Sequence, residues 1–396
     1  MSSLSADDAA AYLGVSKQTL YAYVSRGLVS SEPTATRERR YPRWSLDELK
    51  ARRAGRHEPA AAGMLLWGVQ PIESALLLVE GDRMYYRGLD AVELARTRTY
   101  EEVARLLWDG TMDGAAALFP RRSEGRAPAD LDERLFAALV DARAEPAVSL
   151  NAPSEATLRA AGALVGRLFE AAGARGDGPL AHRLARGWNA DPELLSAALV
   201  LCAEHGLNAS SFTARVVAAT DAPLVNALLG ALSALEGRRH GGVGRLAIRF
   251  LADVDRLGAE RACAEALAAQ GWAPGFWSGN ALHPTGDPRA AELLRLLDLP
   301  ADDPVLEATE HLARLGGVPT VDYALAALEL RRGLPEDAAF ALFALGRSAG
   351  WIAHALESAA TGQLIRPHAR YVGPAPQMSS STAARARMRD LDAPGR

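Results

Sequence analysis

Cysteine is scarce in this sequence. Only two of the 396 residues are cysteines, Cys202 and Cys263, and both fall inside apolar patterns of helical spacing. Two isolated thiols in apolar surroundings are typical of reduced core residues rather than of a disulfide or a metal pair. We therefore expect no metal site and no cofactor.

Long hydrophobic runs and targeting signals are missing as well. No apolar stretch approaches the roughly 20 residues of a membrane-spanning helix. The start, Met1-Ser-Ser-Leu-Ser-Ala-Asp-Asp, has neither the basic residues nor the apolar segment of a signal peptide. These absences predict a cytoplasmic protein without a membrane partner.

What is present describes a globular protein of more than one domain. Hydrophobic residues make up 49% of the chain and charged residues 23%, without a low-complexity tract. The length exceeds that of one ordinary core, so two domains are expected. The charge is uneven: residues 1–56 carry 10 Lys/Arg and 6 Asp/Glu, whereas the rest carries 34 and 42. A basic segment ahead of an acidic body predicts that the first module meets a polyanion.

The first module has the order of a helix-turn-helix. Residues 5–13 form a pattern that Ser5 or Asp7 can cap, and Gly14 ends it. Ser16 can cap a second helix over 17–26, and a third is expected from Ser45. Between them, Thr36-Arg-Glu-Arg-Arg-Tyr-Pro-Arg-Trp44 reads as a basic wing. The module resembles the winged helix-turn-helix of the MerR and excisionase regulators.

That resemblance implies DNA binding through a recognition helix and the wing arginines. Arginines of a wing contact phosphates, which gives affinity and salt dependence. The alternative is a small helical appendage whose arginines are simply solvated. The expected DNA-facing residues are Lys17, Gln18, Thr19, Tyr21, Arg26, Arg37, Arg39, Arg40 and Arg43.

After this module at 1–56, a polar and then small-residue linker is expected at 57–65, followed by a large domain at 66–396. Residues 74–79 and 83–87 form a hairpin pattern around Glu80-Gly-Asp82. Beyond it the fold is predicted to be mostly α, because apolar residues recur at spacings of three and four. The expected helices are 90–108, 131–142, 155–172, 179–187, 192–206, 210–219, 222–236, 244–255, 259–270, 289–297, 305–315, 320–332, 335–347 and 350–360.

Four loops between these helices hold the polar residues that chemistry would need. They are 203–215, 234–243, 274–289 and 317–325, and each bears His, Asp or Arg. Taken singly, each residue has a structural alternative, since a histidine or aspartate near a helix start is commonly a cap. Taken together, they predict one shared polar pocket.

The large domain resembles the citrate synthases. The resemblance rests on Tyr85-Tyr-Arg-Gly-Leu-Asp, Leu207-Asn-Ala-Ser-Ser-Phe, Gly237-Arg-Arg-His-Gly-Gly, Gly286-Asp-Pro-Arg, Thr320-Val-Asp, Gly346-Arg-Ser-Ala-Gly-Trp and Ile365-Arg-Pro-His, in order from about residue 66 to 374. It implies a helical homodimer with a large domain and a small one, the latter at roughly 241–345. It also implies an acyltransferase of the tricarboxylic acid cycle, which condenses acetyl-CoA or propionyl-CoA with oxaloacetate without a metal.

The resemblance also assigns roles to residues. Joining a thioester's methyl carbon to a ketone requires a base and a donor to the enolate oxygen. By resemblance Asp322 is the base and His240 the donor. The residues that match oxaloacetate-binding positions are His205, Arg289, Arg347 and Arg366, the last contributed across the dimer interface.

The third loop departs from the family pattern. The histidine that polarises the ketone is expected nine residues before Arg289, but Asn280 stands there and His283 follows three residues later. Either residue is a candidate for that role. The departure keeps a second hypothesis open, a DNA-binding regulator that senses oxaloacetate, citrate or acyl-CoA without turnover.

Overall fold

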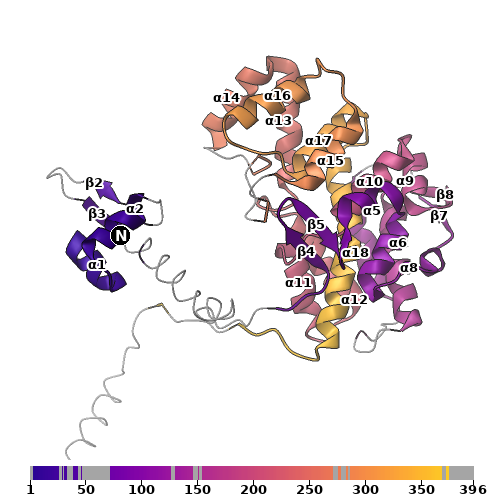
Figure 1. Cartoon of the computed structure of the whole chain (residues 1–396). Helices are drawn as coiled ribbons and strands as arrows, with labels where there is room; N and C mark the ends of the chain where they lie inside the picture. Colours follow the sequence, from indigo (N-terminus) through magenta and orange to yellow (C-terminus); the bar gives the residue numbers. More distant parts are fainter. Residues whose placement is uncertain are drawn as a thin grey trace, which may run out of the picture. The chain divides into compact units, whose positions relative to one another are not determined.

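The computed structural model describes residues 3–25, 29, 31–33, 39–42, 46, 72–125, 130–145, 150, 154–270, 275–277, 282–283, 286–367 and 372–373. The chain divides into two compact units, residues 1–73 with 366–396 and residues 74–365. The predicted linker at 57–65 lies outside the described residues, as does the predicted third helix apart from Leu46. Figure 1 shows the elements of each unit.

The first unit holds two short helices and a three-stranded antiparallel sheet. Helix α1 (Ala6–Leu13) follows Ser5, whose hydroxyl accepts a hydrogen bond from the Asp8 N–H at 3.2 Å, and ends at Gly14 in the left-handed conformation. Helix α2 (Lys17–Ser25) follows Ser16, which accepts from the Thr19 N–H. Strands β1 (Ser3–Leu4), β2 (Glu32–Pro33) and β3 (Arg39–Pro42) pair in the order β1-β3-β2.

These elements pack on a small core of their own, which includes Leu13, Leu20 and Tyr41. Both predicted helix starts are confirmed, and β2 with β3 forms the hairpin of the predicted wing. The pairing of β1 with β3 was not predicted, because two-residue strands leave no alternation to detect.

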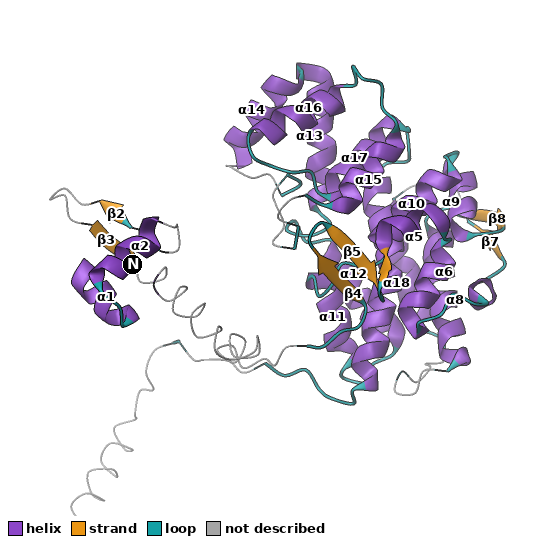
Figure 2. Cartoon of the chain, viewed as in Figure 1, coloured by secondary structure: helices purple, strands orange, loops and turns teal. Residues whose placement is uncertain are grey.

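The second unit opens with the predicted hairpin. Strands β4 (Leu77–Glu80) and β5 (Arg83–Tyr86) pair antiparallel in a register that places Glu80 opposite Arg83, and β6 (Leu89–Asp90) extends the sheet. A second ribbon joins β7 (Arg122–Glu124) to β8 (Arg175–Asp177). Both are small additions to a helical fold, as the colouring of Figure 2 makes plain.

Helices build the rest of this unit, so the mostly-α prediction is confirmed. They are α5 (Ala91–Thr97), α6 (Tyr100–Asp109), the short 3₁₀ helix η1 (Ala115–Leu118), α7 (Leu131–Ala142), α8 (Glu155–Ala171), α9 (Leu180–Trp188), α10 (Pro192–Cys202), α11 (Ala209–Ala218), α12 (Leu224–Leu235), α13 (Val243–Leu257), α14 (Ala259–Gln270), α15 (Pro288–Leu297), α16 (Pro304–Arg314), α17 (Val321–Arg331) and α18 (Ala338–Ala360).

The helix expected over 192–206 ends earlier, at Cys202, and in two places the predicted division into helices is wrong. The single helix expected over 90–108 is two helices, because Thr99 caps α6 in a reciprocal pair with Glu102 and interrupts the run. The two helices expected over 335–347 and 350–360 are one, α18. The glycines near its centre allow close packing and do not end it: a Cβ at Gly346 would lie 2.6 Å from the Leu199 carbonyl oxygen, and one at Gly350 would lie 2.4 Å from that of Ala203.

Helix α18 is the central element of the second unit. It packs against α6, α7, α8, α10, α11, α12 and α17. By length and composition its 23 residues would suffice to cross a membrane, so the expectation that no apolar run is long enough was wrong. The most apolar window of this helix is, however, wholly buried inside the unit. Among the described residues it is the one helix that passes this test.

Candidate active site

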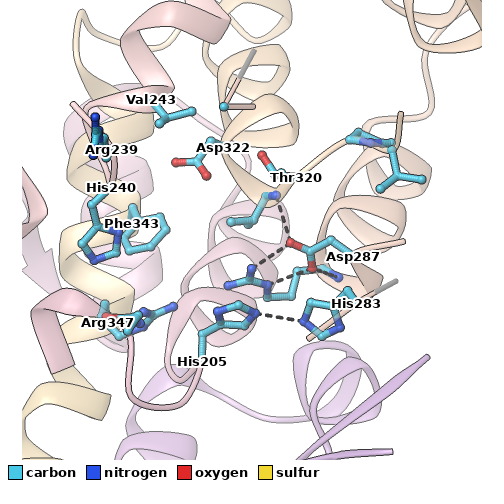
Figure 3. A pocket seen from close by; sticks show the side chains of 16 residues that line it. His205, Arg239, His240, Val243, His283, Asp287, Thr320, Asp322, Phe343 and Arg347 are labelled. Atoms are coloured by element: carbon cyan, nitrogen blue, oxygen red, sulfur yellow. Dashed lines mark hydrogen bonds and ion pairs between the residues drawn. The ribbon is translucent and has the colours of Figure 1, made fainter. Parts of the chain in front are cut away.

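A cavity of about 240 Å³ lies where α15, α17 and α18 meet the loops after α10 and α12. Figure 3 shows its side chains. Six of the eight residues predicted for catalysis or substrate binding line it, namely His205, His240, His283, Arg289, Asp322 and Arg347. Asn280 lies outside the described residues, and Arg366 is exposed and belongs to the other unit.

Two buried arginines give the cavity its positive charge. Arg289 donates from Nε and Nη2 to the two carboxylate oxygens of Asp287, at 2.9 and 2.7 Å. Arg347 donates from Nε to the Cys202 carbonyl oxygen at 2.7 Å, and its guanidinium lies 4.8 Å from the Phe343 ring centroid. Within the described part of the chain, Nη1 of Arg289 and both Nη atoms of Arg347 have no hydrogen-bond partner. Buried guanidinium groups with donors to spare suit a carboxylate ligand.

Two histidines form a neutral pair beside these arginines. Nε2 of His205 and Nε2 of His283 lie 2.9 Å apart, and both side chains are buried. Burial lowers the pKa of His205 well below its usual value, with Arg289 and Arg347 adding to the effect, and burial also lowers the pKa of His283. Because both rings are neutral, one nitrogen of the pair carries the hydrogen and the other accepts it.

His240 is held neutral on another wall of the cavity. Burial, followed by the charge of Arg347, lowers the pKa of His240 to about 4. Its Nε2 lies 2.8 Å from the Ser210 hydroxyl, which accepts a hydrogen bond from the Trp351 indole N–H at 3.0 Å. Its ring also meets Phe343 edge-on, with centroids 5.8 Å apart. The ring therefore has a fixed orientation and no net charge at neutral pH.

Asp322 is a carboxylate of raised basicity in the first turn of α17. Burial raises the pKa of Asp322 to about 6, and the Asp287 charge adds to this while Arg289 opposes it. Among the described residues no other residue donates a hydrogen bond to its carboxylate, whereas Asp287 accepts from both Arg289 and the Val321 N–H. Burial acts against ionisation at Asp287 too, but Arg289 outweighs it and lowers the pKa of Asp287. Two neighbouring carboxylates thus have opposite protonation tendencies.

Three residues of this arrangement were missed from sequence. Asp287 stands in the Gly286-Asp-Pro-Arg motif without a role assigned from sequence, and in the structure it is also the N-cap of α15. Ser210 and Phe343 lie within helical patterns and carry no signal of a site. Arg239, which stands in the Gly237-Arg-Arg-His-Gly-Gly motif without a role assigned from sequence, also lines the cavity, and its side chain is exposed.

The predicted DNA-facing residues belong to the first unit. Lys17, Gln18 and Tyr21 are exposed on α2, Thr19 is half-buried, and Lys17 pairs with Asp7. Arg39 and Arg40 are exposed on β3. Arg26, Arg37 and Arg43 lie outside the described residues.

A helical fold around a buried site of arginine, histidine and a basic aspartate defines a class, that of enzymes acting by acid–base chemistry on small carboxylates. Comparison with known families makes the assignment specific. The family described as "Citrate synthase, C-terminal domain" matches residues 63–168 and 169–368, and the chain belongs to the citrate synthase family. A second family, described as "Helix-turn-helix domain", matches residues 3–54.

Named relatives agree with this placement. A citrate synthase of Haloferax volcanii is 30% identical over 361 residues, covering 78% of this chain and 95% of the relative. A 2-methylcitrate synthase of Mycobacterium tuberculosis is 29% identical over 332 residues, covering 73% and 84%. The solved citrate synthase of Thermoplasma acidophilum, in ternary complex with carboxymethyl coenzyme A and oxaloacetate, shares the fold with a TM-score of 0.66 at 20% identity, covering 81% of this chain and 98% of that one.

Proposed function

We propose that this protein condenses an acyl-CoA with oxaloacetate and releases free CoA. The observation that carries the proposal is the juxtaposition of Asp322, whose pKa is raised to about 6, and the neutral His240 in a cavity with buried arginines. A base of that pKa is half ionised near pH 6 and about 90% ionised at pH 7. A neutral imidazole has one N–H, and this group donates a hydrogen bond to an enolate oxygen.

The proposed reaction begins at the acyl donor. Asp322 removes a proton from the carbon next to the thioester carbonyl, and the thioester oxygen takes up the negative charge as an enolate. The single hydrogen of the Ser210 hydroxyl lies between two acceptors, Asn208 Oδ1 and Nε2 of His240, each 2.8 Å away. In the tautomer that the reaction needs, the hydroxyl donates to Nε2, so that Nδ1 of His240 carries the ring hydrogen and stabilises the enolate oxygen. The enolate carbon then attacks the ketone carbon of oxaloacetate. Water finally cleaves the thioester, which yields citrate or its methyl homologue and CoA.

Oxaloacetate is held by the spare donors. Arg289 and Arg347 offer three guanidinium nitrogens without partners in the described residues, which match the carboxylates of a dianion. We assign Arg366 to the same substrate in the site of a second protomer, so the working form is a homodimer. Arg366 is exposed here and thus accessible for such a role.

The ketone oxygen needs a donor of its own, and we assign it to the His205–His283 pair. The two rings share one hydrogen over 2.9 Å inside the cavity, next to Arg289. As the ketone carbon becomes tetrahedral, its oxygen gains negative charge and accepts a hydrogen bond from an N–H of this pair, which keeps its hydrogen. His283 thereby fills the role that Asn280, at the family's usual position, would otherwise have to serve.

The acyl donor is proposed to be acetyl-CoA or propionyl-CoA. The relatives include both a citrate synthase and a 2-methylcitrate synthase, whose names differ by one methyl group on the product. One methylene discriminates by only about 10- to 200-fold in a hydrophobic pocket. Both donors therefore belong in every assay.

The test is free-thiol release from each donor in the presence of oxaloacetate. We expect turnover with at least one donor, and a loss of about 10²- to 10⁴-fold in Asp322→Ala, because that variant lacks the base. Turnover undiminished in Asp322→Ala would overturn the assignment. Saturable oxaloacetate binding without thiol release from either donor would establish a sensor instead.

The first unit supports a second function, binding to DNA. Exposed Lys17, Gln18 and Tyr21 on α2, with exposed Arg39 and Arg40 on β3, give it a polar and cationic face suited to a groove and its phosphates. We propose that this unit binds duplex DNA, either alongside catalysis or as the output of a sensor.

The proposed compartment is the cytoplasm. Cys202 and Cys263 are free thiols, which fits a reducing environment.

A further inference from the structure

The second unit has another cavity, which shares no lining residue with the first. It encloses about 630 Å³. Its walls come from the start of α6, from η1 and the residues that follow it, and from the start of α9; they include Glu101, Ala116, Ala117, Phe119, Pro120 and Arg183. In Figure 1, α6 and α9 lie beside β7 and β8, and η1 packs against α6. A cavity of this size is in the range of small-molecule sites.

The apolar wall of this cavity is fixed by tight packing on α8. A Cβ at Gly162 would lie 2.2 Å from the Leu118 carbonyl oxygen, and one at Gly166 would lie 2.6 Å from the Pro120 ring. The two glycines therefore let the segment 118–120 press against the helix. Such backbone contact leaves the wall little freedom to collapse inward, so the cavity is preformed.

Two buried charges line the cavity without pairing with each other. Arg183 is 2% exposed and Glu101 5% exposed, and no hydrogen bond between them is found among the described residues. Burial raises the pKa of Glu101, and the charge of Arg183 opposes this effect. Nη1 of Arg183 donates to the Ser123 hydroxyl at 3.1 Å, while Oε1 of Glu101 accepts from the Leu180 N–H at 2.6 Å. Among the described residues, Nε of Arg183 and Oε2 of Glu101 have no partner. An unpaired buried charge is costly, which favours an outside group as its partner.

The local field favours an anion. The N-termini of α6 and α9 both reach this cavity and carry partial positive charge. The guanidinium of Arg183 adds a full positive charge, which the carboxyl group of Glu101 opposes. We propose that this cavity binds a small organic anion with an apolar body and one hydrogen-bond donor. Its acidic group pairs with Arg183, its donor meets Glu101, and its apolar part covers Phe119 and Pro120.

The probe for this site is 8-anilinonaphthalene-1-sulfonate, which combines an anion, an aromatic body and one N–H. Its fluorescence is titrated with the full chain while excess oxaloacetate is present. We expect one saturable site per chain, weakened about tenfold in Arg183→Gln through loss of a charged hydrogen bond. Ala117→Trp, which fills the cavity from an exposed position, is expected to abolish that site without touching a buried charge.

Arg186→Gln is the matched control, because Arg186 is exposed on the same helix and does not line the cavity. It is expected to leave the titration unchanged. Circular dichroism shows whether each variant is folded. If Arg183→Gln does not fold, the titration of Ala117→Trp tests the proposal. A wild-type titration curve in Ala117→Trp, equal losses in Arg186→Gln, or no saturable site in the unaltered chain would each overturn the proposal.

Discussion

Asp322 and His240 are tuned in opposite directions by the same burial. Burial raises the pKa of the Asp322 carboxyl to about 6 and lowers the pKa of the His240 imidazole to about 4. Between pH 6 and pH 4, Asp322 therefore gains a proton while His240 stays neutral. At pH 7 the pair is a carboxylate base and an uncharged donor. This is the combination that proton abstraction next to a thioester needs.

A pH profile tests this tuning. Because Asp322 works only when ionised, kcat/KM for the acyl donor is expected to fall about tenfold per pH unit below pH 6 and to level off above it. The fall is expected to steepen near pH 4, where His240 becomes protonated. Thiol release measured from pH 4 to pH 8 at constant ionic strength gives the profile. A flat rate between pH 5 and pH 7 would contradict the assigned base.

His283 is the residue whose role depends most on this structure. We expect His283→Ala to lower kcat by about 10²-fold, because one donor to the developing alkoxide is lost. His311→Ala, on α16, serves as the control and is expected to keep full activity. Adding Asn280→His to His283→Ala should restore part of the rate by returning a histidine to the family's usual position. Wild-type turnover in His283→Ala would remove it from the mechanism.

The sequence predicted six residues of the cavity but not how they are held. Asp287 fixes Arg289, two residues further along the chain, through two hydrogen bonds, and Ser210 on α11 contacts His240 in the loop after α12. Motifs list the reacting groups because chemistry restricts their type. Their supporting residues are ordinary helix residues and caps, which local patterns cannot distinguish from core.

At the scale of elements, helix existence was predictable from periodicity, whereas continuity depended on tertiary contacts. The segments predicted at 131–142 and 259–270 match α7 and α14 to the residue. In α18, a break was expected between residues 347 and 350, yet the helix is continuous there, and Gly346 and Gly350 face the end of α10 at backbone contact distance. A glycine that permits close packing and one that ends a helix look alike in sequence.

This difference predicts opposite effects of the same substitution. Gly350→Ala is expected to lower the free energy of unfolding by about 1–3 kcal/mol, since the added methyl overpacks against Ala203 and Glu204. Gly244→Ala, in α13, has open space around the added carbon and is expected to raise it by up to about 1 kcal/mol through helix propensity. Urea unfolding of both variants gives the comparison. A stabilised Gly350→Ala would show that α18 can shift away from α10.

At the scale of the whole molecule, every lining residue of both cavities belongs to the unit of residues 74–365. A chain of residues 72–396 is therefore expected to retain oxaloacetate binding and thiol release within about twofold, since it keeps Arg366 and loses none of the catalytic groups. Isothermal titration and the thiol assay measure both. A large loss of binding or turnover would mean that residues 1–71 take part in the site. The Gly244→Ala variant is the folded reference with which the expression level and melting temperature of the shortened chain are compared.

The same shortened chain separates the DNA function from catalysis. Residues 1–56 carry 10 Lys/Arg against 6 Asp/Glu, whereas the rest of the chain is acidic, so affinity for duplex DNA is expected only in the full chain. Each phosphate that a cation neutralises contributes about −0.9 to the slope of log K against log salt. Arg39→Gln with Arg40→Gln is thus expected to reduce that slope by about 2.

Arg261→Gln is the matched control for that measurement, because Arg261 is exposed on α14 in the other unit and is expected to leave the slope unchanged. Fluorescence anisotropy of a labelled duplex between about 50 and 200 mM salt covers the range over which phosphate contacts change affinity most visibly. Equal binding by the shortened chain would move the contact to the second unit. If the full chain binds neither specific nor random duplex at low salt, α2 and β3 belong to a solvated appendage and the DNA proposal is wrong. The condensation proposal is tested by its own assay and does not depend on this result.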